Sequence, residues 1–345
     1  MKLPTMGHGC QCSYLNTSTI VYDYFVWDGP RYPRMIAYPS QKEALSMSAS
    51  KNIKSDTLST LGLFGKYGDK GVGEVIHQLS EFLAARRLKI LVEEGTAALM
   101  TQPPAASYSW SHIGKHADLA IVVGGDGTML NVARNLAGYE VPLIGINLGR
   151  LGFLTDIPKD HMFEGLGKIL DGDFQTEERI LLHAEVLREG KIKHSCYALN
   201  DVVINKGQLA RLIEFETYID GDFVNSTRAD GIIIATPTGS TAYALSAGGP
   251  ILHATLPAMV LVPICPHTLS NRPIAVSSDS RIEIIMTHTS HQCAHVTLDG
   301  QINFSLQDQD SIQVRRGDKP ITLIHPSDRN HYHVLRAKLR WGEKF

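Results

Sequence analysis

The stretch Leu119–Leu130 reads LAIVVGGDGTML and joins an apolar run to a turn in which three glycines surround one carboxylate. The apolar run predicts a buried strand, and a helix is expected to begin near Thr128. Glycines let backbone N–H groups approach an anion closely, and a helix start favours negative charge. We therefore predict a strand, a phosphate-binding turn at Gly124, Gly125, Gly127 and Thr128, and a helix start.

The carboxylate of Asp126 is the unusual group in this turn. A negative charge in a phosphate site is unfavourable unless it holds a metal ion or accepts a proton from an attacking hydroxyl, as kinase aspartates do. The turn therefore indicates phosphoryl transfer, although a tight turn with Asp126 as a local cap stays open. The sequence has no Walker motif, and no complete Gly-x-Gly-x-x-Gly lies at this turn, which disfavours the two commonest nucleotide-binding folds.

The pattern around the turn alternates between short apolar runs and helical periodicity. We predict strands at 58–64, 88–92, 117–123 and 141–146, and helices at 72–85, from about 128, and at 159–170. This order is typical of a Rossmann-like α/β domain with a largely parallel sheet, in which ligands bind beyond the carboxyl ends of the strands.

The remainder of the chain is rich in strands. We predict them at 181–188, 196–204, 212–219, 232–235, 259–264 and 281–286, with further short strands to 324 and a closing helix at 326–341. We therefore expect an α/β domain at 58–157, completed by about 326–345, and a second, β-rich domain at 158–325. Residues 1–57 lack a sustained period and are predicted to be an N-terminal extension, flexible or loosely docked.

Composition restricts the class of protein. A chain of 345 residues with net charge -2 has room for about two domains and no electrostatic surface suited to nucleic acid or to an anionic membrane. Its five scattered cysteines favour a reducing compartment, and no apolar run approaches the roughly 20 residues of a membrane span. We expect a cytoplasmic protein with no membrane or nucleic-acid partner.

A second polar motif spans Asp230–Pro250 and reads DGIIIATPTGSTAYALSAGGP. A buried strand leads into a loop rich in hydroxyls and glycine, and then into a helix start of small residues. Hydroxyls and free N–H groups suit ribose and phosphate recognition, and Tyr243 can stack on a ring. Asn200-Asp201 and Asp299-Gly300-Gln301 also lie at strand ends, where turn formation and ligand binding are equally open.

Two candidate metal sites are weaker. Cys10 and Cys12 form a single Cys-x-Cys, which favours two free thiols. His288, His291 and His295 have a helical spacing, but their surroundings predict a turn between strands, so solvent-facing histidines are favoured.

From about Leu58 onwards, the chain resembles the bacterial, ATP-dependent NAD kinases. The matching motifs are Gly124–Thr128, Gly145–Asn147 with Gly152–Asp156, Leu199–Asp201, Asp230–Pro250 and Pro266–Pro273. The resemblance implies transfer of the ATP γ-phosphate to the adenosine ribose 2'-hydroxyl of NAD, giving NADP. It also implies that Asp126 is the general base and that Mg²⁺ is carried with ATP, with no certain metal ligand from the protein.

The resemblance further implies a set of substrate-contacting residues in the turn, in both polar motifs and beside them. They are Gly124, Gly125, Gly127, Thr128, Asn147, Asn200, Asp201, Arg211, Arg228, Asp230, Thr241, Ala242, Tyr243, Ala244, Leu245, Ser246 and Gln301. The implied fold is an α/β domain that carries the phosphate donor, a β-rich domain that binds NAD, and a C-terminal helix that returns to the first domain. Family members are homodimers or homotetramers.

Two other functions remain open from the sequence. Lipid and sugar kinases with a related Gly-Gly-Asp turn would keep the chemistry and change the acceptor. A dinucleotide sensor without activity would keep the turn only as a binding loop.

Overall fold

The computed structural model describes residues 58–69, 71–149, 151–207, 212–288 and 294–341. All the described residues belong to one compact unit. The predicted N-terminal extension, Cys10, Cys12, Arg211 and His291 lie outside the described residues.

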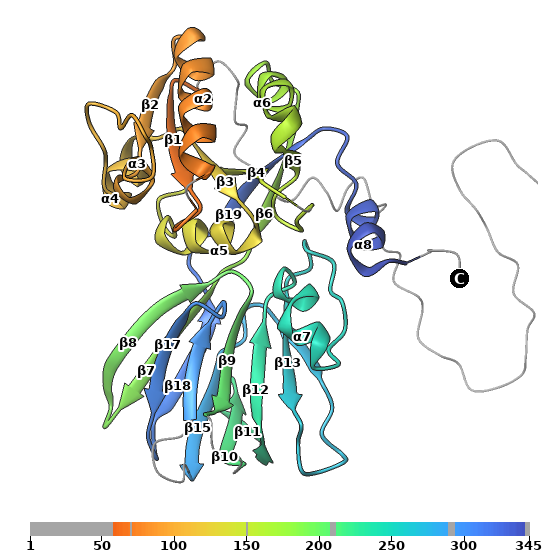
Figure 1. The fold of residues 1–345 in the computed structure, drawn as a ribbon. Coiled ribbons are helices and arrows are strands. Elements are labelled where there is room, and N and C mark those ends of the chain that lie inside the picture. Colours follow the sequence, from red (N-terminus) through yellow and green to blue (C-terminus); the bar gives the residue numbers. More distant parts are fainter. Residues whose placement is uncertain (1–57, 70, 150, 208–211, 289–293, 342–345) are drawn as a thin grey trace, which may run out of the picture. The chain divides into compact units, whose positions relative to one another are not determined.

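The first sheet carries the glycine-rich turn at the end of one of its central strands (Figure 1). Its strand order is β2-β1-β3-β4-β19-β6, with a short β5 beside β4. Neighbouring strands are parallel except for β6, which runs antiparallel to β19. The bounds are β1 Thr60–Gly65, β2 Lys89–Val92, β3 Leu119–Gly124, β4 Leu143–Asn147, β5 Ile157–Pro158, β6 Phe174–Arg179 and β19 Ile321–Pro326.

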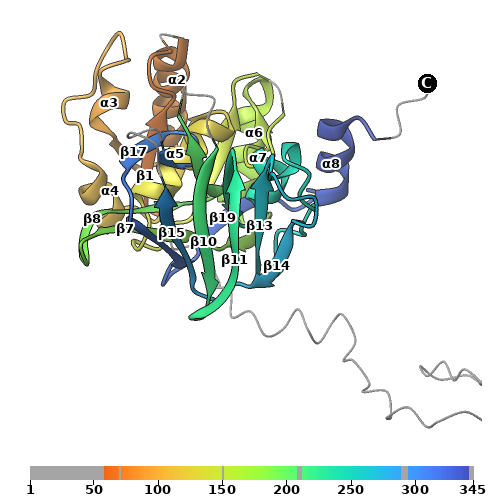
Figure 2. The same ribbon diagram turned by 90° about the horizontal axis from the view of Figure 1, so that it is seen from below.

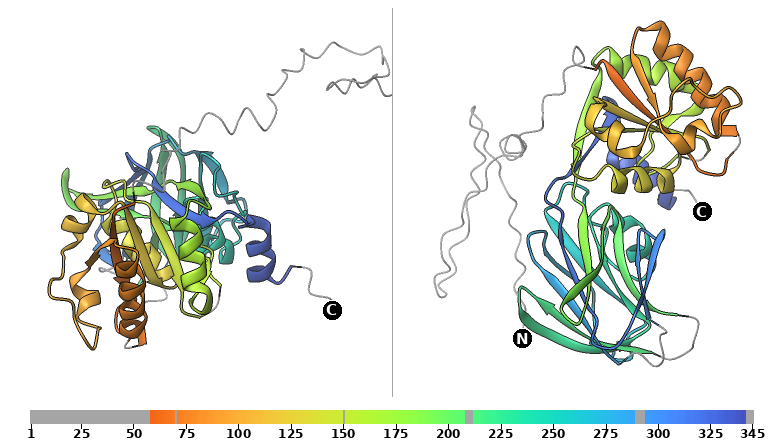
Figure 3. Two further views of the ribbon diagram at one scale, coloured as in Figure 1. Left: turned by 90° about the horizontal axis from the view of Figure 1, so that it is seen from above. Right: turned by 90° about the vertical axis from the view of Figure 1, so that its left-hand side faces the viewer.

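Helices flank this sheet on both faces (Figure 3). Apolar residues of α2 (Gly71–Ala85) and α6 (Met162–Leu170) form one core with the sheet, and those of α4 (Trp110–His116) and α5 (Asp126–Asn135) form the other. The short α3 (Glu94–Ala97) follows β2. Because all six residues of β3 are buried, the run LAIVVG reads as continuously apolar rather than alternating.

The β-rich part contains two antiparallel sheets, and Figure 2 labels strands of both. Their orders are β11-β10-β15-β18-β7-β8 and β14-β13-β12-β9-β16-β17. Alternate residues of both sheets share a single core, as in a β-sandwich. The bounds are β7 Leu182–Arg188, β8 Lys191–Ala198, β9 Asp201–Lys206, β10 Ile213–Ile219, β11 Asp222–Ala229, β12 Gly231–Ala235, β13 Ala258–Ile264, β14 Ile274–Ser277, β15 Ile282–His288, β16 Ala294–Leu298, β17 Ile302–Leu306 and β18 Ser311–Arg316.

The predicted fold class is confirmed: a mostly parallel α/β sheet is followed by an antiparallel β-rich domain. The sequence analysis drew the boundary between the two domains at residue 157. In the structure, three later elements belong to the α/β domain: α6 packs on the first sheet, and β6 and β19 are strands of that sheet. The predicted single strand at 196–204 is also two strands. It is interrupted at Leu199-Asn200 because the N–H groups of residues 199–201 turn toward the Asp299 carboxylate.

The C-terminal helix α8 (His331–Leu339) follows β19 of the first sheet. It is shorter than the predicted 326–341, and the Asn330 side chain caps it by accepting the N–H of His333. The Lys338 ammonium lies 5.7 Å from the ring centroid of Phe153, in the loop after β4, so the helix returns to the α/β domain as predicted. None of the helices in the described part of the chain has the length and apolar character needed to cross a membrane.

Candidate functional site

The glycine-rich turn connects β3 to α5, and the helix begins at Asp126 with Gly125 as its N-cap. A Cβ atom on Gly124 would lie 2.3 Å from Thr128 Oγ1, so only glycine lets the first turn of the helix approach the strand this closely. The free N–H groups and positive end of a ten-residue helix therefore face the carboxyl end of the sheet.

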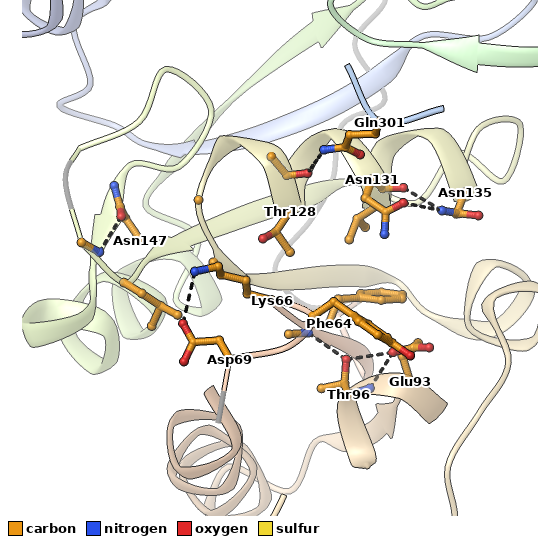
Figure 4. A pocket seen from close by; sticks show the side chains of 18 of the residues that line it. Phe64, Lys66, Asp69, Glu93, Thr96, Thr128, Asn131, Asn135, Asn147 and Gln301 are labelled. Carbon is orange, nitrogen blue, oxygen red and sulfur yellow. Dashed lines mark hydrogen bonds and ion pairs between the residues drawn. The ribbon is translucent and has the colours of Figure 1, made fainter. Parts of the chain in front are cut away.

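A cavity of about 870 Å³ opens at this turn (Figure 4). It brings together six of the predicted site residues: Gly124, Gly125, Gly127, Thr128, Asn147 and Gln301. The sequence analysis missed the rest of its lining, which is Phe64, Gly65, Lys66, Tyr67, Asp69, Glu93, Thr96, Trp110, Asn131, Val132, Asn135, Leu148 and Gly149.

Lys66 and Asp69 supply charge to this cavity from the end of β1. The Lys66 Nζ lies 3.3 Å from Asp69 Oδ2. The N–H of Gly71 and then the Lys66 ammonium lower the pKa of Asp69, so its carboxyl is ionised at neutral pH. Both side chains line the same cavity as the turn that begins α5.

The other wall of the cavity is aromatic. The rings of Phe64 and Trp110 stack with centroids 4.7 Å apart. The nearby Glu93 carboxylate is already engaged, because it caps α3 by accepting the N–H groups of Gly95 and Thr96 at 2.8 and 2.7 Å. The cavity thus combines an apolar wall with a polar floor, as nucleotide sites do.

The Asp126 carboxylate points to the loop after β4. Its Oδ2 accepts the N–H of Phe153 at 2.9 Å, and its Oδ1 accepts the N–H of Leu154 at 3.0 Å. The same Oδ1 also accepts the hydroxyl of Thr155, whose Oγ1 lies 3.4 Å away. Because an ionised carboxylate oxygen has two lone pairs, Oδ2 keeps one for another donor. Of the described residues at this turn, Gly125 and Gly127 line the 870 Å³ cavity, whereas Asp126 between them does not.

A buried ion pair connects the turn to the β-rich domain. Arg134 of α5 donates to Asp299 Oδ2 at 2.8 Å and to Gln301 Oε1 at 2.6 Å. Gln301 Nε2 in turn donates to the Gly127 carbonyl at 2.8 Å. The Asp299 carboxylate also accepts the N–H groups of Leu199, Asn200 and Asp201. One group of side chains therefore fixes the phosphate turn against the Asn200-Asp201 loop.

The two polar motifs of the β-rich domain are in direct contact. Asp201 begins β9 and pairs with Ala235, the last residue of β12, so residues 199–201 and the loop after β12 lie at one end of the sheet. The N–H of Thr236 donates to the Asn200 carbonyl at 2.9 Å. A Cβ on Gly239 would lie 2.0 Å from that same carbonyl oxygen, so this contact requires glycine.

Asp201 is buried at this junction. Burial, together with the neighbouring Asp299 carboxylate, raises the pKa of Asp201 to about 7. A buried carboxyl group whose pKa is raised toward neutral pH is common at functional sites.

Three hydroxyls of the second motif make hydrogen bonds within the protein. Thr236 donates to the Leu199 carbonyl, Ser240 to the Pro237 carbonyl, and Thr238 accepts from Arg179. All three side chains are buried, so they brace the loop instead of facing a ligand. From sequence, a hydroxyl on a loop gives no indication of which way it points.

The predicted contacts from Thr241 to Ser246 divide between surface and core. Tyr243, the first residue of α7 (Tyr243–Ser246), is 45% exposed, whereas the Ala244 side chain is fully buried in a small core behind the sheet. Thr241, Ala242 and Leu245 are partly exposed and Ser246 is exposed. Any ligand contact of Ala244 is therefore through its backbone.

Arg228 and Asp230 are not brought to the turn. They precede β12, whereas the hydroxyl-rich loop follows it, so they lie at opposite ends of that strand. Arg228 pairs with Glu214, and Asp230 pairs with Lys206. Within the part of the chain that the structure describes, no three His, Cys, Asp or Glu side chains are grouped so as to hold a metal ion.

Comparison with known proteins gives the family. Residues 61–174 match the ATP-NAD kinase N-terminal domain, and residues 199–326 match the ATP-NAD kinase C-terminal domain. The chain is 50% identical to an NAD kinase of Thiobacillus denitrificans over 285 residues, which cover 83% of this chain and 98% of that relative. It is 49% identical to an NAD kinase of Nitrosospira multiformis over 288 residues, covering 84% and 97% of the two chains.

Solved structures agree. An NAD kinase from Archaeoglobus fulgidus in complex with ATP superposes with a TM-score of 0.63 at 26% identity, covering 81% of this chain and 98% of that one. A yeast NADH kinase complexed with NADH has the same fold, with a TM-score of 0.74 at 24% identity over 84% and 89% of the two chains. On motifs, fold and relatives together, this chain belongs to the NAD kinase family, whose members are phosphotransferases.

Proposed function

We propose that this protein transfers the γ-phosphate of ATP to the adenosine ribose 2'-hydroxyl of NAD, with Asp126 as the general base. The observation that carries the proposal is the contact between two motifs that are far apart in sequence: Gln301 donates to the carbonyl of Gly127. That contact places the phosphate turn beside the loop of Asn200 and Asp201, so donor and acceptor can meet there.

The donor is assigned to the 870 Å³ cavity. The N–H groups at the start of α5 donate hydrogen bonds to phosphate oxygens, and the Lys66 ammonium adds a positive charge. The stacked Phe64 and Trp110 rings offer an apolar wall for the adenine base. The NAD kinase from Archaeoglobus fulgidus was solved in complex with ATP, which supports ATP as the donor.

Asp126 contributes through its orientation. Two backbone N–H groups fix the carboxylate, and the remaining lone pair of Oδ2 is available to a hydroxyl. A ribose 2'-hydroxyl placed there loses its proton to Oδ2 as it attacks the γ-phosphorus, and ADP leaves on the opposite side.

The cavity also suits Mg²⁺ brought in by ATP. Its lining presents hard oxygen donors, namely the carboxylate of Asp69, the hydroxyl of Thr128 and the amides of Asn131 and Asn135. When bound, Mg²⁺ neutralises charge on the transferring phosphates. Asp69, ionised at neutral pH, is the protein group that we assign to hold it.

NAD is assigned to the Asn200-Asp201 loop and to the exposed residues around Tyr243. Arg228 and Asp230 lie at the other end of β12, so we assign their contacts to the NAD site of a neighbouring subunit in a homodimer or homotetramer. Light scattering that finds an active monomer would contradict this assignment.

Replacement of Asp126 by asparagine tests the mechanism. The change keeps the size and the hydrogen-bond acceptor toward Phe153 or Leu154 but removes the base, so kcat for NADP formation is expected to fall by about 10² to 10⁴. NAD and ATP binding, measured by calorimetry, should change little. A variant with nearly wild-type kcat would refute the role of Asp126, and a wild-type protein that binds NAD without forming NADP would refute the proposed function.

A further inference from the structure

A buried cluster of five ionisable side chains lies next to the loop after β4, whose Phe153 and Leu154 N–H groups bind the Asp126 carboxylate. Its members are Asp156 from the end of that loop, Glu177 and Arg179 from β6, His325 from β19, and Arg329 from the segment between β19 and α8. The exposed fractions of these side chains are 10%, 16%, 4%, 1% and 7% in the same order. The cluster joins three separate segments of the chain: the loop that ends at Asp156, strand β6, and the stretch from His325 to Arg329.

The five groups pair almost completely. Arg329 Nε lies 3.0 Å from Asp156 Oδ1, and its Nη1 lies 3.1 Å from Glu177 Oε2. His325 Nδ1 hydrogen-bonds to Asp156 Oδ2, and Arg179 Nη2 lies 2.8 Å from Glu177 Oε2. Two carboxylates are thus opposed by two guanidinium groups, and the hydrogen bonds and charges of the histidine and arginines hold the pKa values of Asp156 and Glu177 below their usual range despite burial.

Such a cluster is poor evidence for stability alone. The desolvation of buried charges cancels much of their attraction, and well-packed apolar residues of similar volume often stabilise a fold as well or better. What charged pairs do supply is directional geometry, because guanidinium groups bind carboxylates and carbonyls in fixed planes.

One residue, Phe153, connects this cluster to Asp126. The N–H of Phe153 donates to Asp126 Oδ2 at 2.9 Å, and the carbonyl of the same Phe153 accepts Arg329 Nη2 at 3.0 Å. Arg329 therefore holds both the carbonyl of Phe153 and, three residues on, the carboxylate of Asp156. These two contacts fix the ends of the segment whose N–H groups orient Asp126.

The opposite side of the cluster reaches the second polar motif. Arg179 Nη1 donates to Thr238 Oγ1 at 3.2 Å, in the loop that follows β12. The next residue, Gly239, packs against the Asn200 carbonyl. The cluster thus touches the loops of both proposed substrates.

We propose that Arg329 is a positioning residue, which fixes the orientation of the Asp126 carboxylate through the backbone of Phe153; the effect on turnover rests on the proposed function of Asp126. Arg329 makes no contact with the reacting groups. It acts by restricting the motion of the loop whose N–H groups bind Asp126. The placement of the base matters because a displacement of about 1 Å can lower the rate by about 10²-fold.

The kinetic test compares Arg329→Gln and Arg329→Lys with Arg188→Gln. Arg188 is the matched control, because it also binds a buried carboxylate, that of Asp310, through two contacts of 2.8 Å, but on β7 of the sandwich. We expect Arg329→Gln to lower kcat by about 10- to 100-fold with the KM for NAD within about threefold of wild type, Arg329→Lys to recover part of the loss, and Arg188→Gln to keep wild-type kcat. In an Asp126→Asn background, Arg329→Gln should have no further effect.

Amide hydrogen exchange gives a second readout that does not need activity. The N–H groups of Phe153 and Leu154 are bonded to Asp126, so their exchange should accelerate in Arg329→Gln and stay at the wild-type rate in Arg188→Gln. Unchanged exchange in Arg329→Gln overturns the proposal, as does an unchanged kcat in an active enzyme or an equal kcat loss in Arg188→Gln. A wild-type protein that forms no NADP refutes the proposed function instead, and the exchange measurement still decides whether Arg329 positions Asp126.

Discussion

Gly152 leaves the space that the Asp126 carboxylate occupies. A Cβ atom at this position would lie 2.1 Å from Asp126 Oδ1 and 2.3 Å from Thr155 Oγ1. We therefore expect Gly152→Ala to push the carboxylate away from the N–H groups of Phe153 and Leu154 and to lower kcat by about 10- to 100-fold. Steady-state kinetics with NAD and ATP measure this.

The matched control is Gly167→Ala. Gly167 lies inside α6, where a new Cβ would meet only the flexible end of Arg86 at 3.3 Å. Alanine is favoured over glycine in a helix by about 1 kcal/mol, so this variant should keep its activity and lose no stability. Equal activity of the two variants would show that Gly152 does not govern the placement of Asp126.

Asp201 makes stability depend on pH. Its pKa is about 7 in the folded protein, against an ordinary value of 3.8 that applies to the unfolded chain. Between these values the unfolded chain ionises while the folded protein stays protonated, so the contribution of Asp201 to stability falls as pH rises from about 4 to about 7. Asp201→Asn removes this penalty and should stabilise the protein by up to about 4 kcal/mol above pH 7.

Urea unfolding at pH 4.5 and pH 8 measures this effect. The gain of Asp201→Asn over wild type should be small at the lower pH and largest at the higher one. A gain of the same size at both pH values would mean that titration of Asp201 is not its cause.

The turn after β16 joins the two domains at the site, because its residue Asp299 binds both Arg134 of α5 and the backbone of residues 199–201. Its buried carboxylate accepts three backbone N–H groups and the Arg134 guanidinium. Asp299→Asn keeps the shape but leaves Arg134 buried without an opposite charge, which we expect to cost about 3 to 5 kcal/mol in free energy of unfolding. Asp318→Asn, whose ion pair with Arg315 is exposed, should cost less than about 1 kcal/mol. Denaturant titrations that give equal losses would contradict this account of the junction.

The elements themselves were largely predictable from the sequence. Periodicity located four strands and three helices of the α/β domain within a few residues, because each buries one apolar face or run. The short elements Glu94–Ala97, Trp110–His116 and Ile157–Pro158 and the strand Phe174–Arg179 were not predicted. Sheet membership was not predictable for Phe174–Arg179 and Ile321–Pro326, since a strand pattern does not encode which neighbour it pairs with. The break after Ala198 depends on Asp299, a hundred residues away, and has no local signal.

The site was predicted in part, for a similar reason. The glycine-rich turn carries its chemistry in consecutive residues, and the structure brings six predicted residues into one cavity. Lys66 and Asp69 were missed because a single lysine and a single aspartate after a strand match no motif. The cluster around Arg329 is assembled from three separate segments, so only the folded chain reveals it.

At the scale of the whole molecule, both domains contribute to one reaction, at the place where the α/β domain contacts the sandwich. The Gly127–Gln301 contact and the Arg134–Asp299 pair bring the phosphate turn of the α/β domain to the loops of the sandwich. Neither domain alone contains both the glycine-rich turn, where we propose that the donor binds, and the Asn200-Asp201 loop. The reaction product should therefore identify the hydroxyl that faces Asp126.

The most direct measurement is phosphate transfer from γ-labelled ATP to NAD and to an NAD analogue that lacks the adenosine 2'-hydroxyl. The account predicts labelled NADP from NAD, with the label on the 2' position, and no labelled product from the analogue at any concentration that still binds. Labelling of the analogue, or of another hydroxyl of NAD, would contradict it.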